Sequence, residues 1–427
     1  MTVMKKISVV GFGKIGQAVV ANILDHDIHV SAVDINPDLK RIFESGQYES
    51  NEPGLADSLN KSFGKGLLQI TDDFSAVKGS QAIIVAIPLL VDKQKNILDE
   101  PFLDCFKKLA PYLTDNVLIV IETSIPVGYG RNTVVPAIES MGKKHGTDFL
   151  LVHSPERIKS GSMLKQLLVT PKVIGGVSKE ATEKAYEIYQ WFFNRDLIHI
   201  VDSIEAAEMV KLAGMAYRDV NIALSNQLAQ FAQRINVNFA DLIPLINTDG
   251  EAYLLQPGIG VGGHCTPVYP YFLINNFRNA GMNFVLASES RVINDEMAKH
   301  AVSLISNSVN HKKALILGLS FRPNIKEDTF STTYLLRDAL LQEGFEVVLH
   351  DTEFSADDIK RKGFNPVSDI YSSGAEAVFV VTIHEQYKNI DYAKLASTGV
   401  RFLLDGRNGL DKAAAEAAGI KYTGIGR

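Results

Sequence analysis

Cysteine and long apolar runs are both scarce in this 427-residue chain. Its two cysteines, Cys105 and Cys265, are too few for a disulfide scaffold and favour a reducing compartment. The most apolar stretch, residues 82–91, is interrupted by Pro88 and is too short to cross a bilayer. The opening segment reaches its first glycines after only a few apolar residues, which is too short for a signal peptide. We therefore expect a cytoplasmic protein with no membrane partner.

Strong charge is also lacking, since the formal net charge is only −6. A mildly acidic chain argues against binding to the phosphate backbone of a nucleic acid or to an anionic membrane. Hydrophobic residues make up 46% and charged residues 22%, which is the balance of a globular protein. At this length the chain exceeds one ordinary core, so two or three domains are expected.

The N-terminal part alternates short apolar strands with helical stretches. Strands are expected at 6–10, 29–34, 82–87, 117–122 and 149–154, and the first two are joined by a helical pattern from Gln17 to about Asp25. This βαβ alternation predicts a parallel, doubly wound sheet.

The pattern changes beyond Asp202. One long helix is expected over 203–236, followed by a glycine-rich loop at 257–267 and further helix to about Asn310. A second α/β pattern follows, with strands expected at 312–321, 346–351, 377–382 and 401–406. The turn at Gly318 lacks the full dinucleotide fingerprint, so the two halves should bind different ligands. The predicted fold is α/β, with two Rossmann-like doubly wound domains (1–202 and 306–427) joined by a central long-helix domain (203–305).

A dinucleotide site is indicated at the first strand–helix turn. Gly11, Gly13 and Gly16 have the G-x-G-x-x-G spacing, which lets the backbone approach a pyrophosphate at a helix N-terminus. Asp34 ends the second strand, where a carboxylate can accept hydrogen bonds from a ribose and would repel the 2′-phosphate of NADP. The combination predicts NAD. The alternatives are a tight turn that binds nothing, or a flavin.

A candidate nucleophile lies in the glycine-rich loop. Cys265 ends the sequence GIGVGGHC, where a thiol can be reached and backbone amides can surround a developing negative charge. A thiolate there could add to an aldehyde, and loss of hydride from the adduct would give a thioester. The alternative is a small buried apolar cysteine, which Cys105 fits well.

Three titratable residues each have alternative roles that the sequence does not separate. His264 could be a base or a substrate contact, but no second ligand lies at metal spacing, so no metal is expected. Lys211 lies among apolar neighbours and would either snorkel to solvent or be held as a catalytic group. Glu156 follows a strand end and could be a general base or the ion-pair partner of Arg157.

Several segments together resemble the UDP-glucose/GDP-mannose dehydrogenase family. They are GFGKIG, NEPGL (51–55), ETSIPVG (122–128), SPERI (154–158), PKVIGG (171–176), AAEMVKLA (206–213), AYRDVNIALSN (216–226), PGIGVGGHCTPVYPYFL (257–273), GLSFRPN (318–324) and DGRN (405–408). They cover nearly the whole chain in the family's order. The pairing of GGHC with AYRDVNIA is most similar to the branch that acts on UDP-N-acetylmannosamine or UDP-N-acetylglucosamine.

The resemblance implies two successive NAD-dependent oxidations at C6 of a UDP-sugar, and a homodimer through the 203–236 helix. Carried over, Cys265 is the nucleophile, Lys211 stabilises an oxyanion or shuttles protons, Glu156 activates water, and Ser124 positions a water or the substrate. The implied cofactor contacts are Gly11, Gly13, Ile15, Gly16, Asp34, Ser124 and Glu156. The implied substrate contacts are Arg157, Lys211, Arg218, Gly262, His264, Tyr269, Phe321 and Arg322.

Four positions depart from the family's pattern. Met215, Tyr269, Thr329 and Leu89 stand where the family has Asn, Asp, Arg and Thr. Met215 comes four residues after Lys211, on the same helix face, and replaces an amide by a thioether. The alternatives to full activity are therefore altered or single-step oxidation of a related nucleotide sugar, or a non-catalytic nucleotide-sugar-binding paralogue. A 6-phosphogluconate or 3-hydroxyacid dehydrogenase would explain neither the GGHC loop nor the second α/β domain.

Overall fold

The computed structural model describes residues 4–92 and 94–427, so the first three residues of the opening segment lie outside it. The chain divides into two compact units, Met1–Ala213 and Gly214–Arg427. The boundaries expected at 202/203 and 305/306 stay predictions.

The first unit is built on an α/β sheet. Within the described residues, this sheet has eight strands, in the order β10-β9-β8-β7-β4-β1-β2-β3. Five of them confirm expected strands: β1 (Lys6–Val10), β2 (His29–Val33), β4 (Ala82–Val85), β7 (Val117–Ile121) and β8 (Phe149–His153). These five are parallel to their neighbours in this set, and β7 and β8 are buried on both faces, as expected for a central parallel sheet.

Three strands of this sheet were not expected from the sequence: β3 (Leu68–Thr71), β9 (Lys172–Gly176) and β10 (Ile198–Ile200). The expectation of a wholly parallel sheet is wrong at one place, because β9 runs antiparallel to β8. Short strands with interspersed polar residues give too little periodicity to be identified. A small hairpin of β5 (Leu90–Val91) and β6 (Ile97–Leu98) lies outside the main sheet.

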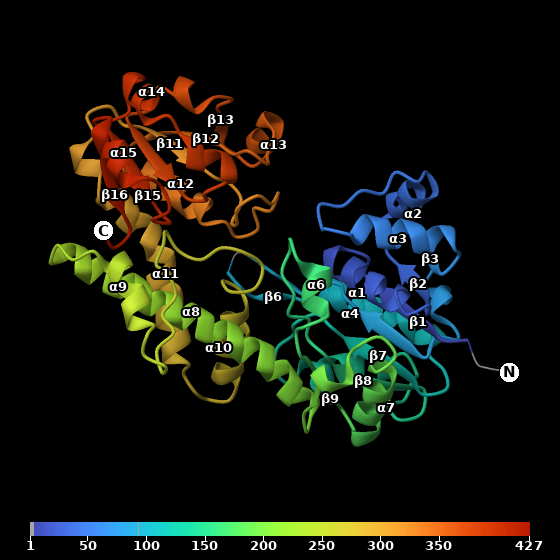
Figure 1. Ribbon diagram of the computed structural model, residues 1–427. Coiled ribbons are helices and arrows are strands. Elements are labelled where there is room, and N and C mark those ends of the chain that lie inside the picture. Colours follow the sequence, from blue (N-terminus) through green and yellow to red (C-terminus); the bar gives the residue numbers. More distant parts are fainter. Residues whose placement is uncertain (1–3, 93) are drawn as a thin grey trace. The chain divides into compact units, whose positions relative to one another are not determined.

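Helices cover the sheet of the first unit. In Figure 1, α1 and α3 lie side by side. Residues of these two helices and of α6 and α7 share one apolar core with alternate strand residues such as Ile7 and Val9. The helices are α1 (Lys14–Leu24), α2 (Pro37–Glu44), α3 (Leu55–Gly64), α4 (Glu100–Leu109), α5 (Val135–Glu139), α6 (Met163–Leu167) and α7 (Lys179–Tyr189). α7 begins where the Ser178 side chain accepts a hydrogen bond from the amide of Ala181.

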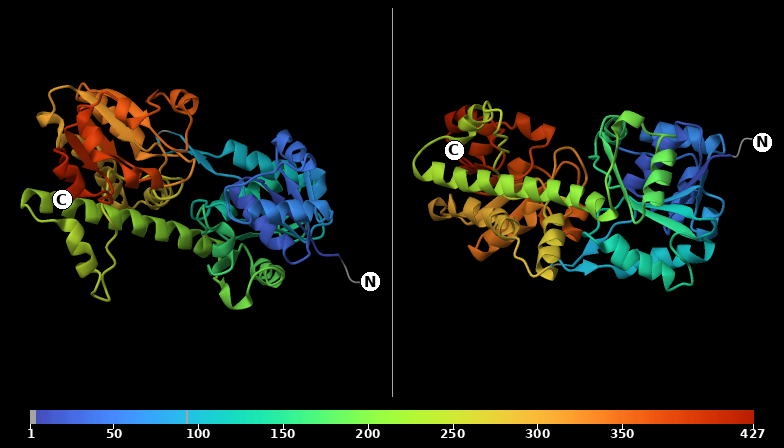
Figure 2. Two further views of the ribbon diagram at one scale, coloured as in Figure 1. Left: turned by 45° about the horizontal axis from the view of Figure 1, so that its top comes forward. Right: turned by 90° about the horizontal axis from the view of Figure 1, so that it is seen from below.

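The long helix expected over 203–236 is confirmed. α8 is continuous from Ile204 to Arg234 (Figure 2). No described helix, α8 included, is long and apolar enough to cross a membrane.

The second unit contains a parallel sheet whose order in the described chain is β13-β12-β11-β14-β15-β16. Four strands confirm expectations: β11 (Lys313–Leu317), β12 (Glu346–His350), β14 (Ala377–Val380) and β15 (Phe402–Asp405). β13 (Asn365–Pro366) and β16 (Lys421–Gly424) were not expected. The Rossmann-like fold expected for this half is therefore confirmed.

Helices of the second unit pack on both faces of this sheet. One core joins α8, α9 (Phe239–Ile246), α11 (Val285–Ser303), α12 (Thr332–Gln342) and α13 (Ala356–Arg361) to the sheet, and another joins α14 (Tyr392–Ser397) and α15 (Lys412–Ala417) to it. α10 (Tyr269–Asn279) follows the glycine-rich loop. The C-terminus lies against the last turns of α8, where Gln233 Nε2 donates to the carbonyl of Gly424 (Figures 1 and 2).

Candidate functional site

The turn between β1 and α1 is shaped as a backbone cradle. Gly11 has a φ of 94°, and a Cβ on Gly16 would lie 1.9 Å from the Gly11 carbonyl oxygen, so neither position tolerates a side chain. A Cβ on Gly13 would meet no described atom within 4 Å, so that side of the turn is open. A pyrophosphate needs such an open backbone face at a helix N-terminus, and these residues therefore fit a dinucleotide.

Asp34 holds this turn in shape. Its Oδ2 accepts a hydrogen bond of 2.7 Å from the amide of Phe12, inside the turn, and its Oδ1 accepts one of 2.9 Å from the amide of Asn36. Each carboxylate oxygen has a second lone pair, so Asp34 keeps capacity for ribose hydroxyls. Ile15 is half-buried in the first turn of α1.

Ser124 and Glu156 lie at the same sheet edge as the glycine turn. They follow β7 and β8, and Gly11 follows β1, in a sheet where the order β1-β4-β7-β8 brings the carboxyl ends of parallel strands together. Ligands of open α/β sheets bind at this edge. Leu89, which follows β4, is 93% buried and belongs to the apolar interior.

Lys211 is joined to Glu156. The Lys211 side chain is buried, and its Nζ donates a hydrogen bond of 2.6 Å to the Glu156 carbonyl oxygen. The reading in which Lys211 snorkels to solvent is therefore wrong, because α8 directs this ammonium into the first unit.

Glu156 is part of an ion pair, but not with the partner expected. Its Oε2 lies 2.7 Å from Lys172 Nζ, and its Oε1 accepts a hydrogen bond of 2.7 Å from the backbone amide of Arg157. The Arg157 guanidinium instead donates to the carbonyl of Pro171. The alternative in which Glu156 pairs with Arg157 is therefore wrong.

Sequence reasoning missed Lys172 and its second partner, Glu122. Glu122 Oε1 lies 2.8 Å from Lys172 Nζ and accepts a hydrogen bond of 2.8 Å from the Tyr189 hydroxyl. Burial raises the pKa of Glu122. At Glu156 burial also favours a higher pKa, but Lys172, the Arg157 amide and Lys211 together outweigh it and lower the pKa of that carboxyl. One available signal was that both residues lie at the ends of apolar runs.

Cys265 lies in a loop that fits tightly against the segment after β11. Gly263 has a φ of 104°, and a Cβ there would come within 2.9 Å of the Phe321 ring. A Cβ on Gly262 would meet Phe321 Cβ at the same distance. The Gly263 amide donates a hydrogen bond of 3.0 Å to the carbonyl of Thr329. The loop therefore needs glycine at both positions, and Cys265 is left partly exposed.

Neighbours of Cys265 include several predicted contacts. The exposed His264 ring lies edge-on to Phe321 at 6.0 Å, and His264 Nε2 lies 4.0 Å from Glu327 Oε2. Tyr269 begins α10, and its amide donates to the Cys265 carbonyl at 2.9 Å. The second unit thus brings together Gly262, His264, Cys265, Tyr269 and Phe321.

A buried polar network anchors the start of this loop. Asn226 Oδ1 accepts a hydrogen bond of 2.9 Å from the Gly258 amide, and Asn226 Nδ2 donates to Asn294 Oδ1 at 2.9 Å. Asn294 in turn donates to Asp219 Oδ1, which also pairs with Arg291 at 2.6 Å. Sequence reasoning did not select these residues, although Asp219 and Asn226 lie in the AYRDVNIALSN segment. Arg218, next to Asp219, is exposed on α8.

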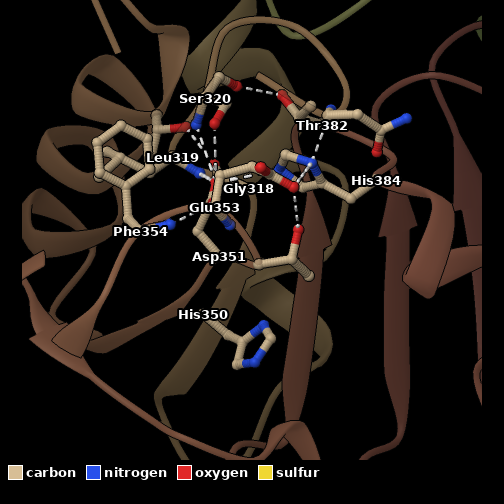
Figure 3. Close-up of polar contacts among 12 residues, drawn as sticks. Gly318, Leu319, Ser320, His350, Asp351, Glu353, Phe354, Thr382 and His384 are labelled. Carbon is tan, nitrogen blue, oxygen red and sulfur yellow. Dashed lines mark hydrogen bonds and ion pairs between the residues drawn. The ribbon is translucent and has the colours of Figure 1, made fainter. Parts of the chain in front are cut away.

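The segment that carries Arg322 is held by the sheet of the second unit. In Figure 3 the Asp351 carboxylate points toward the turn of residues 318–320. Its Oδ2 accepts hydrogen bonds of 2.6 and 3.0 Å from the amides of Leu319 and Ser320. His384 Nδ1 accepts one of 3.0 Å from the Asn324 amide. Arg322 lies between these anchored residues and is partly exposed.

Three of the four departing residues contact the loop of residues 262–266, whereas Leu89 is buried in the first unit. Met215 Sδ lies 4.0 Å from the Thr266 hydroxyl, beside the cysteine loop, and the Tyr269 ring packs against Phe272 at 5.5 Å. Thr329 contacts the loop through its backbone carbonyl, which any residue would supply.

Comparison with known proteins links these parts to one family. The NAD binding domain of the UDP-glucose/GDP-mannose dehydrogenase family matches residues 5–193, its central domain matches 205–296, and its UDP binding domain matches 315–412. The UDP-N-acetyl-D-mannosamine dehydrogenase of Methanocaldococcus jannaschii is 30% identical over 99% of this chain and 96% of its own length.

Solved structures agree in fold over nearly the whole chain. The UDP-D-ManNAc dehydrogenase of Pyrococcus horikoshii superposes with a TM-score of 0.89, at 27% identity and 99% coverage of both chains. The UDP-N-acetyl-mannosamine dehydrogenase of Staphylococcus aureus gives a TM-score of 0.84 at 27% identity, again with 99% coverage of both chains.

Proposed function

The chain belongs to the UDP-glucose/GDP-mannose dehydrogenase family and is an NAD-dependent nucleotide-sugar dehydrogenase, and we propose that it oxidises C6 of a UDP-N-acetylhexosamine to the uronic acid. The observation that carries this proposal is the buried contact between Lys211 and Glu156. It places the Lys211 ammonium on the backbone carbonyl of the residue whose carboxylate is the proposed base, at the sheet edge that also carries the glycine turn. Two relatives that resemble this chain across its length are named as UDP-N-acetyl-D-mannosamine dehydrogenases.

NAD, when bound at the glycine turn, accepts the hydride that leaves C6 in each oxidation. In the first oxidation, the C6 hydroxyl would pass its proton to water while Lys211 stabilises the oxygen of C6. Ser124, buried at the same edge, would hold a water or the substrate hydroxyl.

The second oxidation would use Cys265. Its sulfur adds to the aldehyde carbon and the carbonyl oxygen takes up a proton, which gives a thiohemiacetal. Loss of that proton and of a hydride gives a thioester. Glu156 would then take a proton from water as the water oxygen bonds to the acyl carbon. The carbon–sulfur bond breaks, and Glu156 returns the proton to the leaving sulfur, so the acid and the Cys265 thiol are released.

Substrate recognition would fall to the second unit. Arg322 would form an ion pair with the diphosphate. The segment that carries Arg322 is held at both ends, by hydrogen bonds at Ser320 and at Asn324. Arg218, His264, Tyr269 and Phe321 would contact the sugar or the uridine, and Arg157 is a further proposed substrate contact.

A product assay tests the proposal. UDP-N-acetylmannosamine, UDP-N-acetylglucosamine and UDP-glucose are offered with NAD, and the product is identified by mass spectrometry while NADH is counted per sugar. We expect two NADH and a uronic acid with one of the N-acetylated sugars. Cys265→Ala should abolish acid formation, whereas Cys105→Ala, at a buried cysteine of α4, should leave it unchanged.

A second candidate is favoured by the surroundings of Cys265. Met215 and Tyr269 cannot supply the amide and the carboxylate that the family has there, and loss of one such group commonly costs about a hundredfold or more in rate. The enzyme would then stop after one oxidation or act on a related nucleotide sugar. One NADH per sugar with an aldehyde product would favour this candidate, and binding of UDP-sugar with no NADH would favour a non-catalytic paralogue.

We also propose a homodimer through α8. Leu224, Leu228, Phe231 and Ile235 recur at intervals of three or four residues with 51, 36, 60 and 51% exposure, which makes an apolar stripe in and just after this helix. Light scattering tests it. Phe231→Glu should reduce the mass to that of one chain, whereas Leu341→Glu, at an exposed leucine of α12 outside this stripe, should not. The cytoplasmic location stays a prediction.

A further inference from the structure

The Lys172 ammonium occupies a closed site between two carboxylates and two aromatic rings. Its Nζ lies 2.7 Å from Glu156 Oε2 and 2.8 Å from Glu122 Oε1. The rings of Tyr189 and Phe193 lie 5.7 and 5.5 Å away. The Lys172 side chain is only 3% exposed, so bulk water does not screen these contacts.

The one antiparallel strand of the first sheet creates this arrangement. β9 pairs with β8 so that Gly175 lies opposite His153 and Gly176 opposite Val152. Continued three residues past the last pair, this register would place Lys172 opposite Glu156, and their side chains meet there at 2.7 Å. A parallel β9 would carry Lys172 to the other edge of the sheet, away from the carboxyl ends of β7 and β8.

Glu156 is thereby fixed at every polar atom of its carboxylate and carbonyl. Lys172 binds Oε2, the Arg157 amide binds Oε1 at 2.7 Å, and Lys211 binds the carbonyl oxygen at 2.6 Å. A carboxylate held at both oxygens keeps one lone pair on each for a further donor such as water.

We propose that Lys172 is a positioning residue that fixes the Glu156 carboxylate for proton removal from water during thioester hydrolysis. The inference rests on the proposed function, in which Glu156 is the base. Lys172 does not touch the substrate in this role and acts only through Glu156.

Glu122 competes with Glu156 for the Lys172 ammonium. It shares the same ammonium, so it limits how strongly Lys172 favours the anion of Glu156 and leaves that carboxylate some basicity. The Tyr189 hydroxyl, at 2.8 Å, orients Glu122. The titratable groups facing this cluster are Glu122 after β7, His153 in β8, Lys172 in β9, Tyr189 in α7 and Lys211 in α8.

Opposite pH shifts in two variants test the proposal. In Lys172→Met, Glu156 loses its nearest cation, so the midpoint of the pH profile for hydrolysis should rise by about 1–3 units. The acyl-enzyme should accumulate in intact-protein mass spectra, with steady-state turnover reduced by on the order of a hundredfold at neutral pH. In Glu122→Gln the Lys172 ammonium has Glu156 as its one anionic partner among the two, so the midpoint of the pH profile for hydrolysis should fall.

Two further variants separate positioning from a general loss of structure. Lys172→Arg keeps a cation and should restore most of the hydrolysis rate. Lys179→Met, at an exposed lysine of α7 paired with Glu183, should behave as the wild type. If Lys172→Met does not fold, two other results decide whether Lys172 positions Glu156. They are the downward shift of the hydrolysis midpoint in Glu122→Gln and the hydrolysis rate retained by Lys172→Arg.

Titration of Glu156 without turnover separates this inference from the proposed function. Infrared difference spectra between each protein and its Glu156→Gln counterpart report protonation of that one carboxyl. A wild-type enzyme that forms no acid would refute the proposed function but would leave this titration readable. An unchanged Glu156 titration in Lys172→Met and in Glu122→Gln would overturn the inference, whatever the product.

Discussion

His384 Nε2 lies 3.1 Å from Asp351 Oδ2, and both side chains are fully buried beneath the turn that follows β11 (Figure 3). Because His384 Nδ1 accepts the Asn324 amide, the ring proton lies on Nε2 and is donated to Asp351. Asp351 also accepts the amides of Leu319 and Ser320. The pair therefore ties both ends of the segment carrying Arg322 to β12 and to the chain after β14.

Replacement of His384 by Leu should loosen this segment. The Asn324 amide and Asp351 each lose a buried partner, so the free energy of unfolding should fall by about 1–3 kcal/mol in urea titrations. Calorimetry should show weaker UDP binding. His311→Leu, at an exposed histidine, is the matched control and should change neither value. Unchanged UDP affinity in a folded His384→Leu protein would contradict the link to Arg322.

The two glycines of the cofactor turn should respond differently to alanine. A Cβ on Gly16 would lie 1.9 Å from the Gly11 carbonyl oxygen, so Gly16→Ala should lower both stability and NAD affinity. A Cβ on Gly13 meets no described atom within 4 Å. Gly13→Ala should therefore change the free energy of unfolding by less than about 1 kcal/mol yet weaken NAD binding, because the methyl group occupies the pyrophosphate's approach. Urea denaturation and NAD titration measure the two effects, and equal losses of stability would refute the distinction.

Alkylation should separate the two cysteines. Burial raises the pKa of the Cys105 thiol to about 12, whereas Cys265 is partly exposed. Iodoacetamide at pH 8 should therefore add one carbamidomethyl group to the native protein, at Cys265, and a second only after unfolding. Peptide mass spectrometry locates the label, and Cys265→Ser should take up none while folded. Equal labelling of both thiols would contradict the burial of Cys105.

Acid should destabilise the first unit through His153. Burial lowers the pKa of this imidazole to about 3, against an ordinary value of 6.5. As the pH falls below 6.5, the unfolded chain binds a proton that the folded chain does not. Stability is therefore lost, at about 1.4 kcal/mol per pH unit, until the folded group itself titrates.

His153→Phe tests this linkage. In the part of the chain that the structure describes, neither ring nitrogen of His153 makes a well-aligned hydrogen bond, and only the Ile121 backbone offers a weak one, so an apolar ring should be tolerated at pH 7. Between pH 6.5 and 5 the wild type should lose about 2 kcal/mol more than this variant in urea titrations. His26→Gln, at an exposed histidine, should keep the wild-type pH dependence. A parallel acid limb in His153→Phe would show that other groups dominate.

The amino-acid sequence alone determined the features whose signals are local. The glycine spacing at 11, 13 and 16, the carboxylate at Asp34, the long helix over 203–236 and the repeated strand–helix periods predicted two Rossmann-like halves and NAD. Each of these features follows from neighbouring residues, because a turn's geometry and the hydrophobic periodicity of a helix or strand depend on residues only a few positions apart.

The contacts that assemble the acid–base cluster were decided by the tertiary structure. The burial of Lys211 depends on what α8 packs against, and the choice of Lys172 instead of Arg157 as the partner of Glu156 depends on β9 running antiparallel to β8. Strand direction is set by long-range pairing, since the same five residues could lie either way in a sheet, and only one direction brings the ammonium to the carboxylate.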